Sequence, residues 1–232
     1  MALDRIAERA ADVRRAYTPG ALPTHDDVAT AAAVSDFALD PLAVVAPDGT
    51  YFVTADEQGR RSYARDGSFA LRDGRLVDGG GHRILGVRAP GGAFEELRVD
   101  PVDEALGRVR DAAIEPDGTV VYRREVVDPR SGTTELQRVV SGRIALARFP
   151  AGTRLASSDG SHGSAPSGAD VQNGLPGDGA FASLVPMRRE RSRINIDESL
   201  VRLKEAYLAF DALAAAEASK AHLGKTAMDL LK

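Results

Sequence analysis

The sequence predicts a mainly β protein with flanking helices, in which a β-rich middle domain of hairpins separates N- and C-terminal helices that form a coiled-coil-type assembly region. Apolar residues with heptad spacing lie near both ends of the chain. Between them, short β-type runs alternate with Asp-Gly turn signals. The predicted regions are 1–36, a helix and connector; 37–150, the β-rich domain; 151–190, a Gly/Ser-rich extended linker; and 191–232, the C-terminal assembly helix.

The first region has the apolar spacing of one helix face. Steps of three and four residues join Leu3, Ile6, Ala10, Val13 and Tyr17. The following stretch, 18–23, contains two prolines and a glycine, and proline lacks the backbone donor that would continue a helix. We therefore expect a helix over 1–17, followed by a flexible connector.

The middle region alternates β-type runs with tight turns. The runs lie at 42–45, 51–54, 83–87, 119–122 and 143–149. The turn candidates are Asp48-Gly49, Asp66-Gly67, Asp73-Gly74 and Asp117-Gly118. Asp and Gly tolerate the positive φ that tight hairpins require. The residues that follow, 151–179, have too few large apolar side chains to bury a core of their own, which predicts an extended or mobile linker.

The last region begins with a helix-start signal. Asn195 is suited to the N-cap, and Glu198, three residues later, is suited to return a hydrogen bond. The apolar seam that follows comprises Ile196, Leu200, Leu203, Tyr207, Phe210 and Ala214. Because this seam matches that of 1–17 in kind, the two ends are predicted to pair, within one chain or between chains. The predicted subunit-assembly residues are Leu3, Ile6, Val13, Tyr17, Ile196, Leu200, Leu203, Tyr207 and Phe210.

Composition excludes several classes of partner. Thirty Lys and Arg stand against 34 Asp and Glu, a net charge of -4, which argues against a nucleic-acid-binding face. The chain has no cysteine, so disulfides and thiolate chemistry are absent. Acidic residues interrupt 1–17, so we expect no cleaved secretory signal there, and no later run is long enough for a membrane span.

The residue types that usually act in catalysis or metal binding form no recognisable motif in the sequence. His25, His82, His162 and His222 are scattered, so no metal ligand, cofactor-binding residue or catalytic residue is predicted, and the protein is expected not to be an enzyme. The run Gly79-Gly80-Gly81 lacks phosphate-loop spacing and fits a hairpin turn. The basic cluster Arg188, Arg189, Arg191 and Arg193 fits a contact with an acidic neighbouring subunit, a contact with a lipid or nucleic-acid phosphate, or a solvated charge run.

Several gapped motifs resemble the rod and hook proteins of the bacterial flagellum. The run DGTYF at 48–52 is followed by YARDGSF at 63–69, GRLV at 74–77 and ILG at 84–86, similar to the family's "TR-x-G-x-F", "dG-x-LV" and "vLG". Alanine replaces the threonine at position 64. Downstream, 114–120 and 142–149 resemble the family's "I-dp-dG-tV" and "G-x-I-x-LarF", and 192–197 with Ala206-Tyr207 resembles its C-terminal helix.

This resemblance implies a structural protein of the basal-body rod, or of its hook extension, that assembles into a helical axial tube and transmits torque. Its implied partners are copies of itself, other flagellar axial proteins and the flagellar type III export apparatus. The family's longer N-terminal helix and Asn-rich stretch are missing, and only 18–20 matches a remnant of them.

Two other functions remain open from the sequence. One is an adaptor that binds the rod without polymerising, which the short N-terminal region favours. The other is a glycan-active enzyme of the cell envelope, which requires two carboxylates about 5 to 10 Å apart in a cleft.

Overall fold

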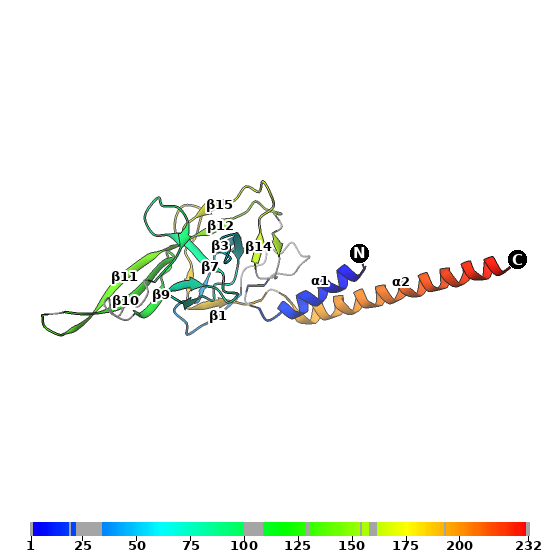
Figure 1. Cartoon of the computed structure of the whole chain (residues 1–232), viewed down its shortest axis with the longest axis horizontal. Coiled ribbons are helices and arrows are strands. Elements are labelled where there is room, and N and C mark those ends of the chain that lie inside the picture. Colours follow the sequence, from blue (N-terminus) through cyan, green and yellow to red (C-terminus); the bar gives the residue numbers. More distant parts are fainter. Residues whose placement is uncertain are drawn as a thin grey trace. The chain divides into compact units, whose positions relative to one another are not determined.

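The computed structural model describes residues 2–18, 20–21, 34–99, 109–128, 130–153, 155–157, 162–192 and 194–230, with the backbone alone for 224–230. The chain divides into two compact units. We call them the helical unit, comprising Met1–Tyr17, Pro23–Asp26 and Ile194–Lys232, and the β unit, comprising Thr18–Leu22 and Asp27–Arg193. Strands predominate over helices, which confirms the predicted mainly β class with a helix near each end (Figure 1).

The β unit is built on one large antiparallel sheet. Its main path runs β13-β14-β4-β3-β7-β11-β10-β9. In chain order these strands are β3 (Thr50–Ala55), β4 (Arg61–Ala64), β7 (Arg83–Val87), β9 (Val109–Ile114), β10 (Thr119–Val127), β11 (Thr134–Ile144), β13 (Ala156–Ser157) and β14 (His162–Ser164). Strands β10 and β11 form a long hairpin that projects from the body of this unit (Figure 1).

Further strands join the sheet from the side or form separate pairs. The side strands are β5 (Ala70–Arg72), β6 (Arg75–Val77), β8 (Glu95–Glu96), β12 (Leu146–Arg148) and β15 (Gln172–Gly174). Two two-stranded ladders pair β1 (Ser35–Phe37) with β17 (Arg188–Glu190), and β2 (Val44–Val45) with β16 (Val185–Pro186). These ladders join residues from the two ends of the β unit.

The core lies on both faces of the sheet because side chains alternate along its central strands. One face carries Phe52, Ile84 and Leu146 into a large apolar cluster. The next residue of each strand, Val53, Leu85 and Ala147, enters a smaller cluster on the other face. Strands that are covered on both faces have nearly continuous apolar sequences. The runs 51–54, 83–87 and 143–149 are of this kind.

Three of the four predicted Asp-Gly turns have the expected backbone. Gly49, Gly74 and Gly118 have positive φ, and Asp73 joins Gly74 in the two-residue turn between β5 and β6. The prediction for Gly67 was wrong in its reason, since its φ is not in the left-handed region. Its backbone instead passes so close to β2 that a Cβ atom there would lie 1.9 Å from the carbonyl oxygen of Val44.

The segment 151–190, expected as a linker, belongs to the β unit wherever it is described. It contributes β13 to β17, and Phe181 and Leu184 are buried in the large apolar cluster. The segment adds strands and apolar side chains to a core formed with residues far away in the sequence.

The helical unit contains α1 (Ala2–Arg15) and α2 (Ile196–Leu230). The two helices contact each other and run antiparallel (Figure 1). The N-terminus of α2 is capped as predicted, because Oδ1 of Asn195 accepts hydrogen bonds from the backbone N–H groups of Asp197 and Glu198 at 3.0 and 3.3 Å. Neither described helix has the length and apolar character that crossing a membrane requires.

Candidate functional site

The predicted assembly residues differ in exposure within the helical unit. On α1, Ile6 is buried and Val13 half-buried, while Leu3 is exposed. Tyr17, just after α1, is 81% exposed. On α2 the half-buried members are Ile196, Leu203 and Phe210, and the exposed members are Leu200 and Tyr207. The structure thus brings part of each predicted seam into the contact between the helices and leaves the rest at the surface.

The buried stripe of α2 is offset from the predicted seam. Half-buried residues recur at Ile196, Ser199, Leu203, Ala206 and Phe210, again with steps of three and four. Leu200 and Tyr207 adjoin this stripe and are 48% and 50% exposed. A single partner helix covers one side of a heptad seam, so the second side remains available for another helix.

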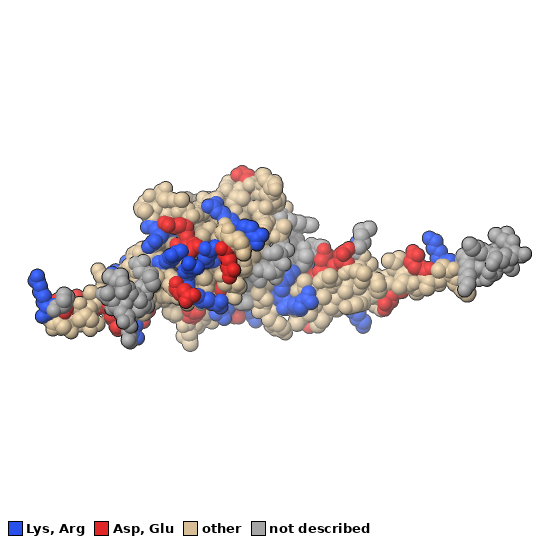
Figure 2. Space-filling model, viewed as in Figure 1, with Lys and Arg blue, Asp and Glu red and all other residues tan. Residues whose placement is uncertain are grey.

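Beyond Phe210, α2 has no covered face among the residues whose side chains are described. Every residue from Asp211 to Leu223 is exposed. Leu213 and Leu223 are 54% and 69% exposed, and Leu208, just before Phe210, is 59% exposed. Apolar residues are distributed around α2 and are not confined to one stripe. Figure 2 shows largely uncharged surface along this helix, with isolated charged side chains.

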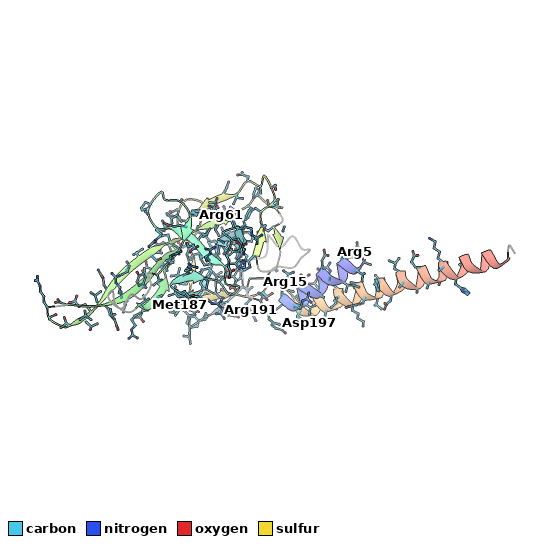
Figure 3. The ribbon with its side chains drawn as sticks, viewed as in Figure 1. Arg5, Arg15, Arg61, Met187, Arg191 and Asp197 are labelled. Carbon is cyan, nitrogen blue, oxygen red and sulfur yellow. The ribbon has the colours of Figure 1, made fainter. Side chains whose placement is uncertain are left out.

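Polar contacts stabilise the helix ends. Asp12 is buried on α1 and pairs with Arg15, whose Nη2 lies 2.8 Å from Oδ1 of the carboxylate. Glu198 in the first turn of α2 pairs with Arg202, one turn later. Arg15 and Asp197 are labelled in Figure 3.

The residues of the "TR-x-G-x-F"-like motif have structural roles in the β unit. Arg65 is buried and donates from Nη2 to Oε2 of Glu190 at 2.6 Å, and from Nε to the same oxygen at 3.1 Å. The guanidinium also donates to the backbone carbonyls of Pro47, Thr50 and Ala46. Arg65 therefore joins the end of β4 to β17 and to the turn before β3.

Other motif positions satisfy close packing. Phe69 packs edge-on against Phe52, with ring centroids 4.9 Å apart. A Cβ atom at Gly86 would lie 2.2 Å from the carbonyl oxygen of Arg143. Phe149 packs edge-on against Tyr51 and Tyr63. The motif residues are thus explained by the packing and backbone approach that the β unit requires.

The basic cluster near the start of α2 is partly engaged within the β unit. Arg188 donates to the backbone carbonyl of Ser35 at 2.9 Å, and Nε of Arg191 lies 3.2 Å from Oδ2 of Asp36. Figure 3 labels Arg191. Arg193 lies outside the described residues. On the viewed face of the β unit, charges of both signs are interspersed (Figure 2).

One cluster of potential metal ligands was not predicted from the sequence. Asp78 and His82 lie at either end of the turn between β6 and β7, and His162 begins β14. Their donor atoms all lie within 4.8 Å of one another. No local spacing predicts this, because the histidines are far apart in sequence and are joined through the pairing of His162 with Ala64 of β4. His25, another histidine considered from the sequence, lies outside the described residues.

A cavity of about 260 Å³ adjoins this cluster. Its lining residues are Thr18, Asp66, Asp78, Gly79, Gly80 and His162. Burial raises the pKa of Asp66 above its ordinary value, and the nearby charge of Asp78 acts in the same direction.

Comparison with protein-family models finds no matching model, and comparison with curated proteins finds no significant match.

Proposed function

We propose that this chain is a structural subunit of the bacterial flagellar basal-body rod or hook, assembling with copies of itself into a helical axial tube that transmits torque. The observation that carries the proposal is the long part of α2 that α1 does not cover. The motif resemblance of the β unit supplies the family, and the helical unit supplies the means of assembly.

The two helices are unequal in length. α1 has 14 residues and α2 has 35, so at 1.5 Å per residue they span roughly 21 and 52 Å. More than half of α2 extends beyond the end of α1. A helix with apolar residues around its whole circumference is normally buried, and 206–219 contains only two charged residues, Asp211 and Glu217.

The occupant that fits this surface best is the same helix from neighbouring copies. Leu200 and Tyr207 belong to the heptad seam whose other members, Leu203 and Phe210, already pack in the helical unit. Alanine is frequent from 206 to 221, which permits close approach of helix backbones. Few charges oppose such packing, so neighbouring copies avoid strong like-charge repulsion.

The proposal extends to partners and location. Other flagellar axial proteins would present similar helices at the ends of a homopolymeric segment, and delivery would use the flagellar type III export apparatus. The place of action would be the periplasmic rod or the adjoining hook. In this role the protein needs no catalytic residue and no cofactor.

The test is the assembly of purified full-length protein. The wild type should form filaments or tubes in electron micrographs and sediment as large species as concentration increases. Leu213→Asp should prevent this, because a carboxylate at a packed apolar position would be desolvated without a partner. Ser219→Asp adds the same charge on the same helix without removing apolar surface, and it should assemble nearly as well as the wild type.

Two results would contradict the proposal. Wild-type protein that stays monomeric at high concentration would favour the adaptor function, in which the chain binds a rod without polymerising. Equal assembly of the wild type and Leu213→Asp would show that α2 is not the assembly surface. The chromosomal neighbours of the coding sequence provide an independent check, since rod and hook proteins require the other axial components.

A further inference from the structure

We propose that Asp78, His82 and His162 form a binding site for one Zn²⁺ ion in the β unit. The inference does not depend on the proposed function. It rests on three side chains from two separate segments, on a buried imidazole nitrogen without a partner and on an adjoining cavity lined by a second carboxylate.

The donor atoms are already close to coordination geometry. Nε2 of His162 lies 2.6 Å from Oδ2 of Asp78, and Nδ1 of His82 lies 3.6 Å from Oδ1 of the same carboxylate. Tetrahedral Zn²⁺ holds nitrogen and oxygen donors at about 2.0–2.2 Å, which places neighbouring donors roughly 3.3 Å apart. These two separations lie on either side of that value, and all the donor atoms lie within 4.8 Å of one another, so side-chain rotations that lengthen the contact between His162 and Asp78 would admit the ion.

The turn between β6 and β7 orients the carboxylate. Oδ1 of Asp78 accepts hydrogen bonds from the backbone N–H groups of Gly80 and His82, both at 2.9 Å. These bonds direct Oδ2 toward His162. Backbone donors of this kind, which fix a ligating carboxylate from behind, are typical of the outer shell of metal sites.

One ligand atom lacks any other explanation. Nδ1 of His82 is inaccessible to solvent and has no hydrogen-bond partner among the described residues. An unpaired buried polar atom destabilises the folded state, so native proteins rarely keep one without a reason. The ring of His82 also packs against that of His162, with centroids 3.7 Å apart and ring planes tilted by 35°, so both imidazoles lie beside the same carboxylate.

Gly80 makes room for the two rings. A Cβ atom at this position would lie 3.1 Å from Cε1 of His162 and 3.1 Å from Nδ1 of His82. The absence of a side chain therefore allows the turn to wrap closely around the imidazoles. The run of three glycines, which the sequence analysis assigned to a hairpin turn, has this additional consequence.

The donor set identifies the class of metal. Two imidazoles and one carboxylate suit Zn²⁺, whereas Ca²⁺ and Mg²⁺ prefer sites made of oxygen atoms. Three protein ligands leave a fourth position for water, and Asp66 lines the adjoining cavity. The ion would join the β6–β7 turn to β14, and so connect the Gly/Ser-rich segment to the centre of the β unit.

The test is calorimetric titration of tag-free, chelator-treated full-length protein with ZnCl₂. The wild type should bind one Zn²⁺ per chain with a dissociation constant of about 1 μM or tighter. Loss of an outer-shell group weakens metal binding roughly 10- to 100-fold, so removing a ligand in His82→Ala or His162→Ala should weaken it by about 100-fold or more. His222→Ala, which removes an exposed histidine of α2, is the matched control and should bind as the wild type does.

Two further measurements make the result decisive. Co²⁺ should give the visible absorption of a tetrahedral ion in the wild type but not in His82→Ala, and excess Mg²⁺ or Ca²⁺ should not displace it. Zn²⁺ should raise the melting temperature of the wild type, with reversal by chelator, and should leave that of His82→Ala unchanged. The half-buried side chain of His82 makes this variant the one expected to fold. Absence of stoichiometric binding, or equal binding by the wild type and His82→Ala, would overturn the proposal.

Discussion

At the scale of single residues, the β unit depends on a buried arginine whose partners are far apart in sequence. Arg65 pairs with Glu190 and donates to three backbone carbonyls. Removing one member of a buried pair leaves the other charge desolvated and unpaired. Arg65 thus has a structural role that accounts for its place in the motif without any catalytic function.

We predict that Arg65→Met lowers the free energy of unfolding by about 3–5 kcal/mol. Chemical denaturation of the full chain measures this. The double variant Arg65→Met with Glu190→Gln should recover part of the loss, because the buried unpaired carboxylate is removed. Arg60→Ala, which breaks the exposed pair with Asp56, is the control and should leave stability unchanged. A loss for Arg65→Met no larger than that of the control would contradict this role.

Glu96 provides a second residue-scale prediction, because three arginines surround it. Partial burial alone would raise its pKa, but the hydrogen bond from Arg98 and the charges of Arg83 and Arg75 outweigh burial and lower the pKa below 4.5. The folded state therefore favours the ionised form. Its contribution to stability is full above the unfolded-state pKa and is lost as pH falls through the lower folded-state pKa.

Glu96→Gln should accordingly lower the free energy of unfolding by about 1–2 kcal/mol near pH 7. The difference from the wild type should disappear at the lowest pH at which both proteins remain folded. Urea denaturation at a series of pH values measures it. If the two proteins differ by the same amount at every pH, the carboxylate charge is not what stabilises this cluster.

At the scale of elements, two glycines are required for different reasons. Gly67 is required by the close approach of another backbone segment, and Gly49 by its positive φ. A Cβ atom at Gly67 would overlap the carbonyl oxygen of Val44, whereas one at Gly49, which has positive φ, meets nothing within 4 Å. Gly49→Ala should cost about 1–2 kcal/mol in stability, because alanine would have to adopt the left-handed conformation. Gly67→Ala should cost more, on the order of 3 kcal/mol, because β2 must move away. Equal melting temperatures of the two variants would refute the close approach.

The elements themselves were predictable where the signal is local. β-type runs, Asp-Gly turns and the Asn195 cap depend on neighbouring residues, and β3, β7 and the start of α2 lie where the sequence indicates. Segment 151–190 was misjudged because its strands are stabilised by distant partners, such as Ala64 for His162. The cluster of Asp78, His82 and His162 was not predicted for the same reason, since only the sheet brings these side chains together.

For the whole molecule, the two units should differ in how much of their stability they obtain within one chain. The β unit buries apolar residues on both faces of its sheet. In the helical unit, α2 is exposed on every side from Asp211 to Leu223. Isolated helices are marginal in water, and ordering costs about 1–2 kcal/mol per residue, which only packing recovers.

Hydrogen exchange on monomeric protein should therefore show three ranges of exchange rate. Amides of β3 and β12 should exchange slowly, and amides of α2 beyond Phe210 should exchange fast. Amides of α2 from Ile196 to Phe210 should exchange at an intermediate rate, because α1 covers this part. Assembly should slow exchange beyond Phe210 to the level of β3, and Leu213→Asp, which does not assemble, should retain the fast rate. If the monomer already protects the end of α2 as strongly as β3, its exposed apolar residues need no neighbour. Packing between copies would then lose its driving force, and the non-polymerising adaptor would become the better hypothesis.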